Sequence, residues 1–84
     1  MSFEVRLLRR AERQLDALPP RLRARVARQL QELQQTARPP GATKPSGREG
    51  YRLRIGDYRM LYEVNDELKV VTIVAVGHRR EVYR

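Results

Sequence analysis

Three arginines stand close together in the segment GYRLRIGDYRMLYEV, residues 50–64. Arg52, Arg54 and Arg59 alternate with apolar and aromatic residues, so in an extended chain their side chains project away from the apolar ones. A guanidinium group is a planar fork of hydrogen-bond donors that matches phosphate oxygens, and it keeps its charge at neutral pH. The pattern favours a site that binds a phosphate group. The arginines thus indicate an anion site, but not yet a reaction.

The end of the chain and one loop add candidates. Tyr83 is a possible proton carrier, because neighbouring arginines lower the pKa of a phenol from about 10; alternatively it is an aromatic residue that covers a sheet edge. His78 is either a catalytic base or a surface or core histidine. Gly77 is expected to end the last strand, so alternation does not assign a face to His78 or Arg79. Lys44 lies in a loop and is a weaker candidate for a phosphate contact.

The composition excludes several other kinds of site and suggests the partners. The 84 residues include no Cys and one His, which excludes a disulfide scaffold, a thiolate metal site, a catalytic cysteine and a cluster of histidines around a metal. No metal or cofactor is expected. A net charge of +8 favours polyanionic partners. The longest apolar run, residues 73–76, is too short to cross a bilayer, and no signal peptide is found. We therefore expect one cytoplasmic domain, residues 1–84, without a membrane partner.

The spacing of apolar residues predicts the elements that must position these side chains. Residues 2–8 alternate like a half-buried strand. A first helix follows and ends at Pro19-Pro20, and a second helix runs from Pro20 to Thr36. Each helix has one apolar face, formed by Leu8, Ala11, Leu15 and Leu18 in the first and by Leu22, Val26, Leu30 and Leu33 in the second. Residues 37–50 contain three Pro and three Gly and are expected to form an irregular surface loop.

Three more strands are predicted after this loop. Residues 51–55 and 58–64 alternate around the turn dipeptide Gly56-Asp57, and a second turn is expected at 65–67. Residues 68–76 are almost entirely apolar, which is typical of a central strand covered on both faces. The order β-α-α-β-β-β predicts an α+β fold, with a small, mostly antiparallel sheet and a two-helix hairpin packed on one of its faces.

A two-residue loop at Gly56-Asp57 fixes the register of the predicted hairpin. The pairs are Ile55 with Tyr58, Arg54 with Arg59, Leu53 with Met60, Arg52 with Leu61, and Tyr51 with Tyr62. The three arginines then share the face opposite to the helices, and two of them lie directly across from each other. Like charges in this position destabilise a sheet. The arginines are either solvated on an exposed face or form a cluster that binds phosphate, and a small domain with little stability to lose favours the cluster.

The arginines of the second helix avoid its apolar face. This placement is explained by a solvated helix surface, and the alternative is a secondary contact with a nucleic-acid backbone. The positions concerned are Arg21, Arg23, Arg25 and Arg28.

Residues 50–64, together with VGHRREVY at 76–83, resemble the RelE-type toxins of the RelE/ParE superfamily of toxin–antitoxin modules. The likeness covers nearly the whole chain and implies the RelE-like fold. It also implies a ribosome-dependent endoribonuclease that cuts mRNA in the decoding site and inhibits translation. Such a toxin is held inactive by a cognate antitoxin, and the pair binds its operator DNA.

The resemblance also implies roles for single residues. Arg59 matches the arginine that stabilises the transition-state phosphate, Arg79 a second arginine near the leaving group, and Tyr83 the tyrosine that orients substrate or transfers a proton. Arg52 and Arg54 stand where relatives often have lysines, and with Lys44 and His78 they complete the expected RNA contacts. Because guanidinium does not deprotonate, the role of base passes to Tyr83 or His78. Ser46 stands where RelE toxins often have an arginine, so one backbone contact is expected to be missing.

Two other functions fit the same fold. One is inhibition of DNA gyrase, as in ParE-like toxins. The other is a non-catalytic relative that only binds antitoxin and operator DNA. Fold alone does not choose between them, because relatives with one fold can carry different activities.

Overall fold

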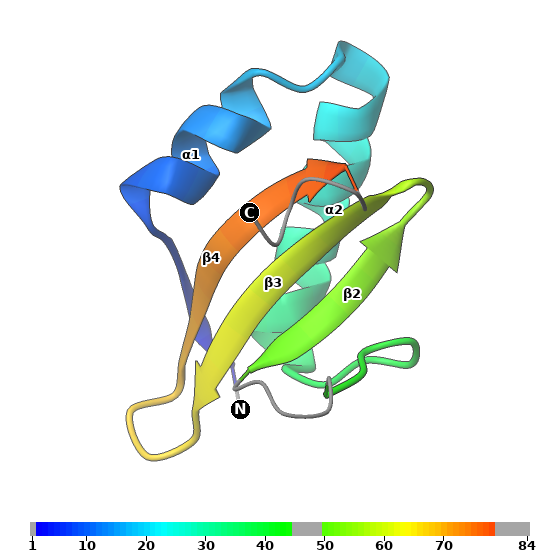
Figure 1. Cartoon of the computed structure of the whole chain (residues 1–84). Helices are drawn as coiled ribbons and strands as arrows, with labels where there is room; N and C mark the ends of the chain where they lie inside the picture. Colours follow the sequence, from blue (N-terminus) through cyan, green and yellow to red (C-terminus); the bar gives the residue numbers. More distant parts are fainter. Residues whose placement is uncertain (1, 45–49, 79–84) are drawn as a thin grey trace.

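The helices and strands follow one another in the predicted order. The computed structural model describes residues 2–44 and 50–78. Strand β1 (Glu4–Leu7) is followed by helices α1 (Arg9–Asp16) and α2 (Pro20–Gln35), and then by β2 (Tyr51–Ile55), β3 (Tyr58–Asn65) and β4 (Val70–His78). The four strands form one sheet in the order β1-β4-β3-β2, in which β1 runs parallel to β4 and the other neighbours are antiparallel (Figure 1). The α+β architecture is as predicted.

The hydrophobic core lies between the helices and one face of the sheet. Helix α2 crosses behind the strands and α1 lies along β4 (Figure 1). The apolar face predicted for the second helix is confirmed, since Val26 and Leu33 are buried and the other two leucines pack against the core. Strand residues that complete the core are Leu53, Ile55, Met60, Tyr62, Val71, Ile73 and Val76. Neither described helix is long and apolar enough to cross a membrane.

The first helix is shorter than its apolar pattern predicts. It spans eight residues, so Leu8 precedes it and Leu18 follows it. Leu8 is 47% exposed, which contradicts its predicted place on the buried face, whereas Leu18 is buried beyond the helix end. Pro20 occupies the first turn of α2, where its missing N–H needs no partner. The second helix thus begins where the sequence predicts.

The turn between β3 and β4 differs from the prediction. It extends to Lys69, and Leu68, predicted as a strand residue, is 73% exposed. The Asn65 side-chain oxygen accepts a hydrogen bond from the Leu68 N–H at 2.9 Å, and Lys69 has a φ of 57°. The asparagine therefore stabilises a longer turn, as Asn side chains often do. Strand β4 begins two residues later than predicted.

The far end of β4 also differs. Gly77 was expected to end the strand, but it pairs with Arg59, and β4 continues to His78 opposite Tyr58. Strand pairing uses only the backbone N–H and C=O, which glycine retains, so a single glycine does not end the ladder. The register shifts where Leu61 pairs with Ala75 and Tyr62 pairs with Ile73. This bulge gives β4 one extra residue and so keeps Ile73 and Val76 on the core face.

Residues 37–44, the described part of the loop after α2, are more regular than expected. Ala37 and Pro39 are buried, and the Tyr62 hydroxyl donates a hydrogen bond to the Ala37 carbonyl at 2.9 Å. The Ala42 N–H bonds the Pro39 carbonyl at 3.0 Å, and Gly41 has a φ of 95°. Proline at the second position and glycine with positive φ at the third are typical of a type II turn. The turn sends the chain back alongside β2.

Candidate phosphate-binding site

The β2–β3 hairpin has the predicted register at every pair. Gly56 has a φ of 60°, whereas Asp57 keeps a negative φ, which is the pattern of a type II′ turn. This turn matches the right-handed twist of the strands and so holds a two-residue connection in place. The register places the three arginines together on the sheet face opposite to the helices.

Two of the arginines are forced into close proximity. Arg54 pairs directly with Arg59 across the hairpin. The backbone N–H and C=O of Arg52 bond Thr43 at 2.7 and 2.9 Å, and they therefore point away from β3. These directions alternate from one residue to the next, so Arg54, two residues after Arg52, also points its N–H and C=O away from β3. Arg54 and Arg59 therefore form a non-hydrogen-bonded pair. Side chains approach each other more closely in such a pair.

The arginines line a common pocket of about 210 Å³. Its walls are Arg52, Arg54 and Arg59 from the hairpin, and Gly41 and Thr43 from the preceding loop. One water occupies about 30 Å³ in the liquid, so the pocket has room for a phosphate group. Neither Arg54 nor Arg59 forms an ion pair with a described residue. The pocket thus combines positive charge with open space.

Lys44 lies beside this pocket and not in it. Its side chain is exposed and lines a separate depression of about 380 Å³, together with Arg38, Tyr51 and Glu63. Because Thr43 belongs to the arginine pocket, the two hollows are neighbours along the same loop.

His78 lies on the helix side of the sheet. Its ring meets the Tyr58 ring edge-on, with centroids 5.6 Å apart at 80°. With Gln14 and Leu18 it lines a third pocket, of about 240 Å³. The structure therefore does not bring His78 together with the three arginines. The predicted site residues Arg79 and Tyr83 lie outside the described residues.

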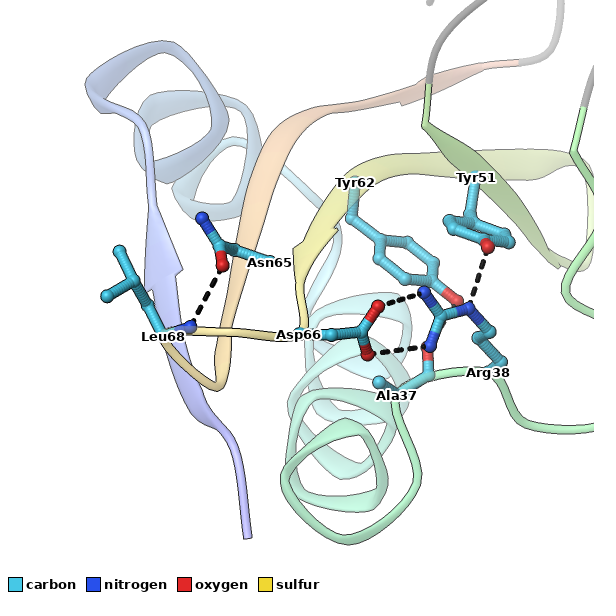
Figure 2. A network of polar contacts seen from close by, with 7 residues as sticks. All are labelled: Ala37, Arg38, Tyr51, Tyr62, Asn65, Asp66 and Leu68. Carbon is cyan, nitrogen blue, oxygen red and sulfur yellow. Dashed lines mark hydrogen bonds and ion pairs between the residues drawn. The ribbon is translucent and has the colours of Figure 1, made fainter.

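Arg38 forms a second arginine centre that no pattern in the sequence indicates (Figure 2). Arg38 donates two hydrogen bonds to the carboxylate of Asp66, at 2.9 and 3.1 Å, and a third to the Tyr51 hydroxyl at 2.6 Å. Its guanidinium also lies 5.1 Å from the centre of the Tyr51 ring, which stacks on Tyr62 at 5.7 Å. We call Arg38, Tyr51, Tyr62 and Asp66 the arginine clamp. It joins the loop after α2 to the β3–β4 turn.

The contacts within the clamp shift the pKa values of its members. The hydrogen bonds from Arg38 lower the pKa of Asp66, and those to Asp66 and Tyr51 raise the pKa of Arg38. Burial raises the pKa of Tyr62 to about 12. At neutral pH, Arg38 and Asp66 are therefore charged and Tyr62 is neutral, which suits a structural contact. Its partners are 28 residues apart, and no spacing pattern in the sequence indicates the pairing.

Within residues 2–44 and 50–78, no three His, Asp or Glu side chains lie where they could hold a metal ion.

Comparisons with known proteins agree with the fold. A model of the ParE toxin of type II toxin–antitoxin systems matches residues 5–83. The toxin RelG of Mycobacterium tuberculosis is 37% identical over 87 residues, covering 100% of this chain and 99% of that protein. The toxin–antitoxin complex RelBE2 of the same organism has a TM-score of 0.80 at 34% identity, covering 94% of this chain and 100% of that one. The archaeal RelE–RelB complex from Pyrococcus horikoshii has a TM-score of 0.81 at 26% identity, covering 98% and 100%.

The matches extend over both helices and the whole sheet, and the resemblance inferred from the hairpin and the chain end is confirmed. The chain is a member of the RelE/ParE superfamily, the toxin of a type II toxin–antitoxin system.

Proposed function

We propose that this toxin is a ribosome-dependent mRNA endoribonuclease whose substrate phosphate binds in the arginine pocket. The observation that supports this proposal is the convergence of Arg52, Arg54 and Arg59 on one pocket. Like charges held this close destabilise the free protein, and a bound phosphodiester would relieve the repulsion. Arginine is well suited to this task, because its donors match two phosphate oxygens at once.

The reaction needs little from the protein beyond charge and alignment. The 2′-oxygen of the ribose attacks the adjacent phosphorus, an O2′–P bond forms, and the bond from phosphorus to the 5′-oxygen breaks. The products are a 2′,3′-cyclic phosphate and a 5′-hydroxyl. Arg59 stabilises the negative charge on the phosphorane, and Arg79 stabilises the leaving oxygen. Ribosomal mRNA is already held in place, which supplies the alignment that a small open pocket lacks.

Proton transfer falls to a residue other than arginine. Guanidinium remains protonated, so none of the three pocket arginines can accept the proton of the 2′-hydroxyl. His78 is paired with Tyr58 on the helix side of the sheet, opposite to the arginine face. Of the two predicted bases we therefore favour Tyr83, which would take the proton of the 2′-hydroxyl, while the leaving 5′-oxygen takes up a proton from water. Arg52 and Arg54 hold the phosphate, and Lys44 contacts the RNA backbone next to the pocket.

A cognate antitoxin is the proposed protein partner. Two similar solved structures are complexes of a toxin with an antitoxin. A net charge of +8 and an exposed arginine face favour an acidic segment that covers this face. Binding there would block the phosphate pocket, and the complex would bind the operator DNA through the antitoxin.

Cleavage on programmed ribosomes tests the proposal. Primer extension on the mRNA, after incubation with purified toxin, should reveal new 5′ ends in the decoding site. Arg59→Ala should lower the cleavage rate at least about 100-fold, the scale for removal of one transition-state donor. Arg9→Ala is the matched control, because Arg9 is exposed on α1, which lies along β4 and not along the hairpin. Cleavage by Arg59→Ala at the wild-type rate would contradict the assignment.

Inhibition of DNA gyrase is the second candidate, because the matching family model is that of the ParE toxins. A gyrase assay with the same preparation separates the two functions. Trapped double-strand breaks in DNA, without new mRNA ends, would favour gyrase as the target.

A further inference from the structure

One side chain of the arginine pocket is uncharged and has a different chemistry. Thr43 lines the pocket beside Arg52, Arg54 and Arg59. Among the described residues, no hydrogen-bond partner is found for its hydroxyl. The following inference rests on the proposed function, because it concerns the RNA that binds in this pocket.

The backbone holds Thr43 firmly in place. Its N–H and C=O both bond Arg52, at 2.9 and 2.7 Å, which makes the two residues a hydrogen-bonded antiparallel pair. Side chains of such a pair project from the same face, with Cβ atoms about 4.5–5.5 Å apart. The turn at Gly41, with its φ of 95°, fixes the approach of the loop. The hydroxyl is therefore held on the arginine face of the sheet and beside Arg52.

The hydroxyl can do what the guanidinium groups cannot. Arginine only donates hydrogen bonds, whereas a threonine hydroxyl also accepts them. A phosphate needs donors, which the arginines provide. A ribose 2′-hydroxyl is itself a donor and needs an acceptor, and this group distinguishes RNA from DNA. Thr43 is the one side chain in the pocket, as the described residues form it, that can accept this hydrogen bond.

We infer that the Thr43 hydroxyl accepts a hydrogen bond from a ribose 2′-hydroxyl next to the phosphate held by the arginines. Thr43 is then a specificity residue that favours RNA over DNA. It acts on the sugar, while the arginines act on the phosphate that both nucleic acids share.

Binding of matched oligonucleotides tests this role. Short single-stranded RNA and its 2′-deoxy counterpart are titrated with wild-type protein, Thr43→Val and Thr43→Ser, and affinity is measured by fluorescence anisotropy. Thr43→Val keeps the shape and loses the hydroxyl, and it should weaken RNA binding about threefold to tenfold, the scale of one hydrogen bond. DNA binding should stay within about twofold. Thr43→Ser should restore the preference for RNA. Thr36→Val, at the end of α2 and outside the pocket, is the matched control.

Two results would overturn the inference. An equal loss on RNA and DNA would mean that Thr43 contacts phosphate or only supports the loop. An unchanged RNA affinity in Thr43→Val would mean that the hydroxyl makes no contact. Cleavage of mRNA on ribosomes by the wild-type toxin is measured in parallel, so a failure of the proposed function is distinguished from a failure of the role of Thr43.

Discussion

The arginine pocket and the arginine clamp use the same side chain in opposite ways. In the clamp, the guanidinium of Arg38 bonds a carboxylate and a phenol of its own chain. In the pocket, Arg54 and Arg59 face each other, and neither forms an ion pair with a described carboxylate. Satisfied donors stabilise a fixed structure, whereas unneutralised donors remain available to an anion. The surroundings of an arginine, more than its presence, indicate which of the two roles it has.

The largest expected effect is on cleavage activity, and it distinguishes the arginine pocket from the arginine clamp. Arg59→Ala should lower ribosome-dependent cleavage at least about 100-fold. It should not lower the free energy of unfolding, because it removes a charge that repels Arg54 and that no described carboxylate neutralises. Arg38→Ala should do the reverse, lowering stability while the folded fraction retains cleavage. Primer extension and urea denaturation of both variants provide the comparison. A large loss of cleavage in fully folded Arg38→Ala would contradict the division of roles.

Removal of the Tyr62 hydroxyl should weaken the clamp alone. Tyr62 is 1% exposed, and its hydroxyl bonds the Ala37 carbonyl. Tyr62→Phe leaves that buried carbonyl unpaired and should lower the free energy of unfolding by about 1–3 kcal/mol. Urea denaturation measures the loss, with Tyr58→Phe as a control on the same strand. Equal stability of Tyr62→Phe and the wild type would show that this bond contributes little.

The raised pKa of Tyr62 predicts a loss of stability at alkaline pH. A phenol has a pKa near 10 in the unfolded chain, and burial raises that of Tyr62 to about 12. The folded state therefore keeps its proton between these values while the unfolded state releases it, so stability falls as pH rises from about 10 to about 12. Tyr62→Phe should remove this part of the pH dependence. Identical alkaline profiles for the variant and the wild type would rule out the titration of Tyr62.

The lowered pKa of Asp66 predicts a smaller loss of stability, which occurs at acidic instead of alkaline pH. The hydrogen bonds from Arg38 favour the charged carboxylate in the folded state. The resulting stabilisation of the folded state is fully present above the pKa of Asp in the unfolded chain, about 3.9. It is lost as pH falls through the lower pKa of Asp66 in the folded state. Asp66→Asn should therefore be less stable than the wild type at neutral pH and should approach it in acid. A constant difference at all pH values would mean that the charge of Asp66 is not involved.

Neutralising one member of the facing arginine pair should have the smallest effect. Arg54→Gln removes the repulsion with Arg59 and should raise the free energy of unfolding by at most about 0.5 kcal/mol, because exposed charges are well screened. The gain should disappear in high salt. Urea denaturation at low and high ionic strength measures it. A loss of stability at low salt would show that Arg54 is satisfied within the folded chain.

The hairpin could be predicted from sequence because its rules are local. A two-residue turn at Gly56 fixes the register, and the register alone places Arg54 opposite Arg59. The apolar face of α2 follows in the same way from the spacing of its apolar residues. These predictions need no information about distant parts of the chain.

The remaining features depend on contacts between distant residues. Arg38 meets Asp66 only because the fold brings a loop and a turn together. Thr43 joins the site through a backbone pair with Arg52, which its side-chain type does not indicate. Leu68 is exposed because its N–H donates a hydrogen bond to the Asn65 side chain. This local bond keeps Leu68 in the turn, although the apolar pattern predicts a strand there.

The salt dependence of binding to a single-stranded oligodeoxynucleotide, which cannot be cleaved by 2′-oxygen attack, tests the phosphate contacts most directly. Each arginine that neutralises a phosphate contributes about 0.7 to the slope of log affinity against log salt concentration for a single strand. The double variant Arg54→Ala/Arg59→Ala should therefore lower the slope by about 1.4, while Arg38→Ala should retain the wild-type slope. An unchanged slope in the double variant would show that these guanidinium groups do not bind the nucleic-acid backbone.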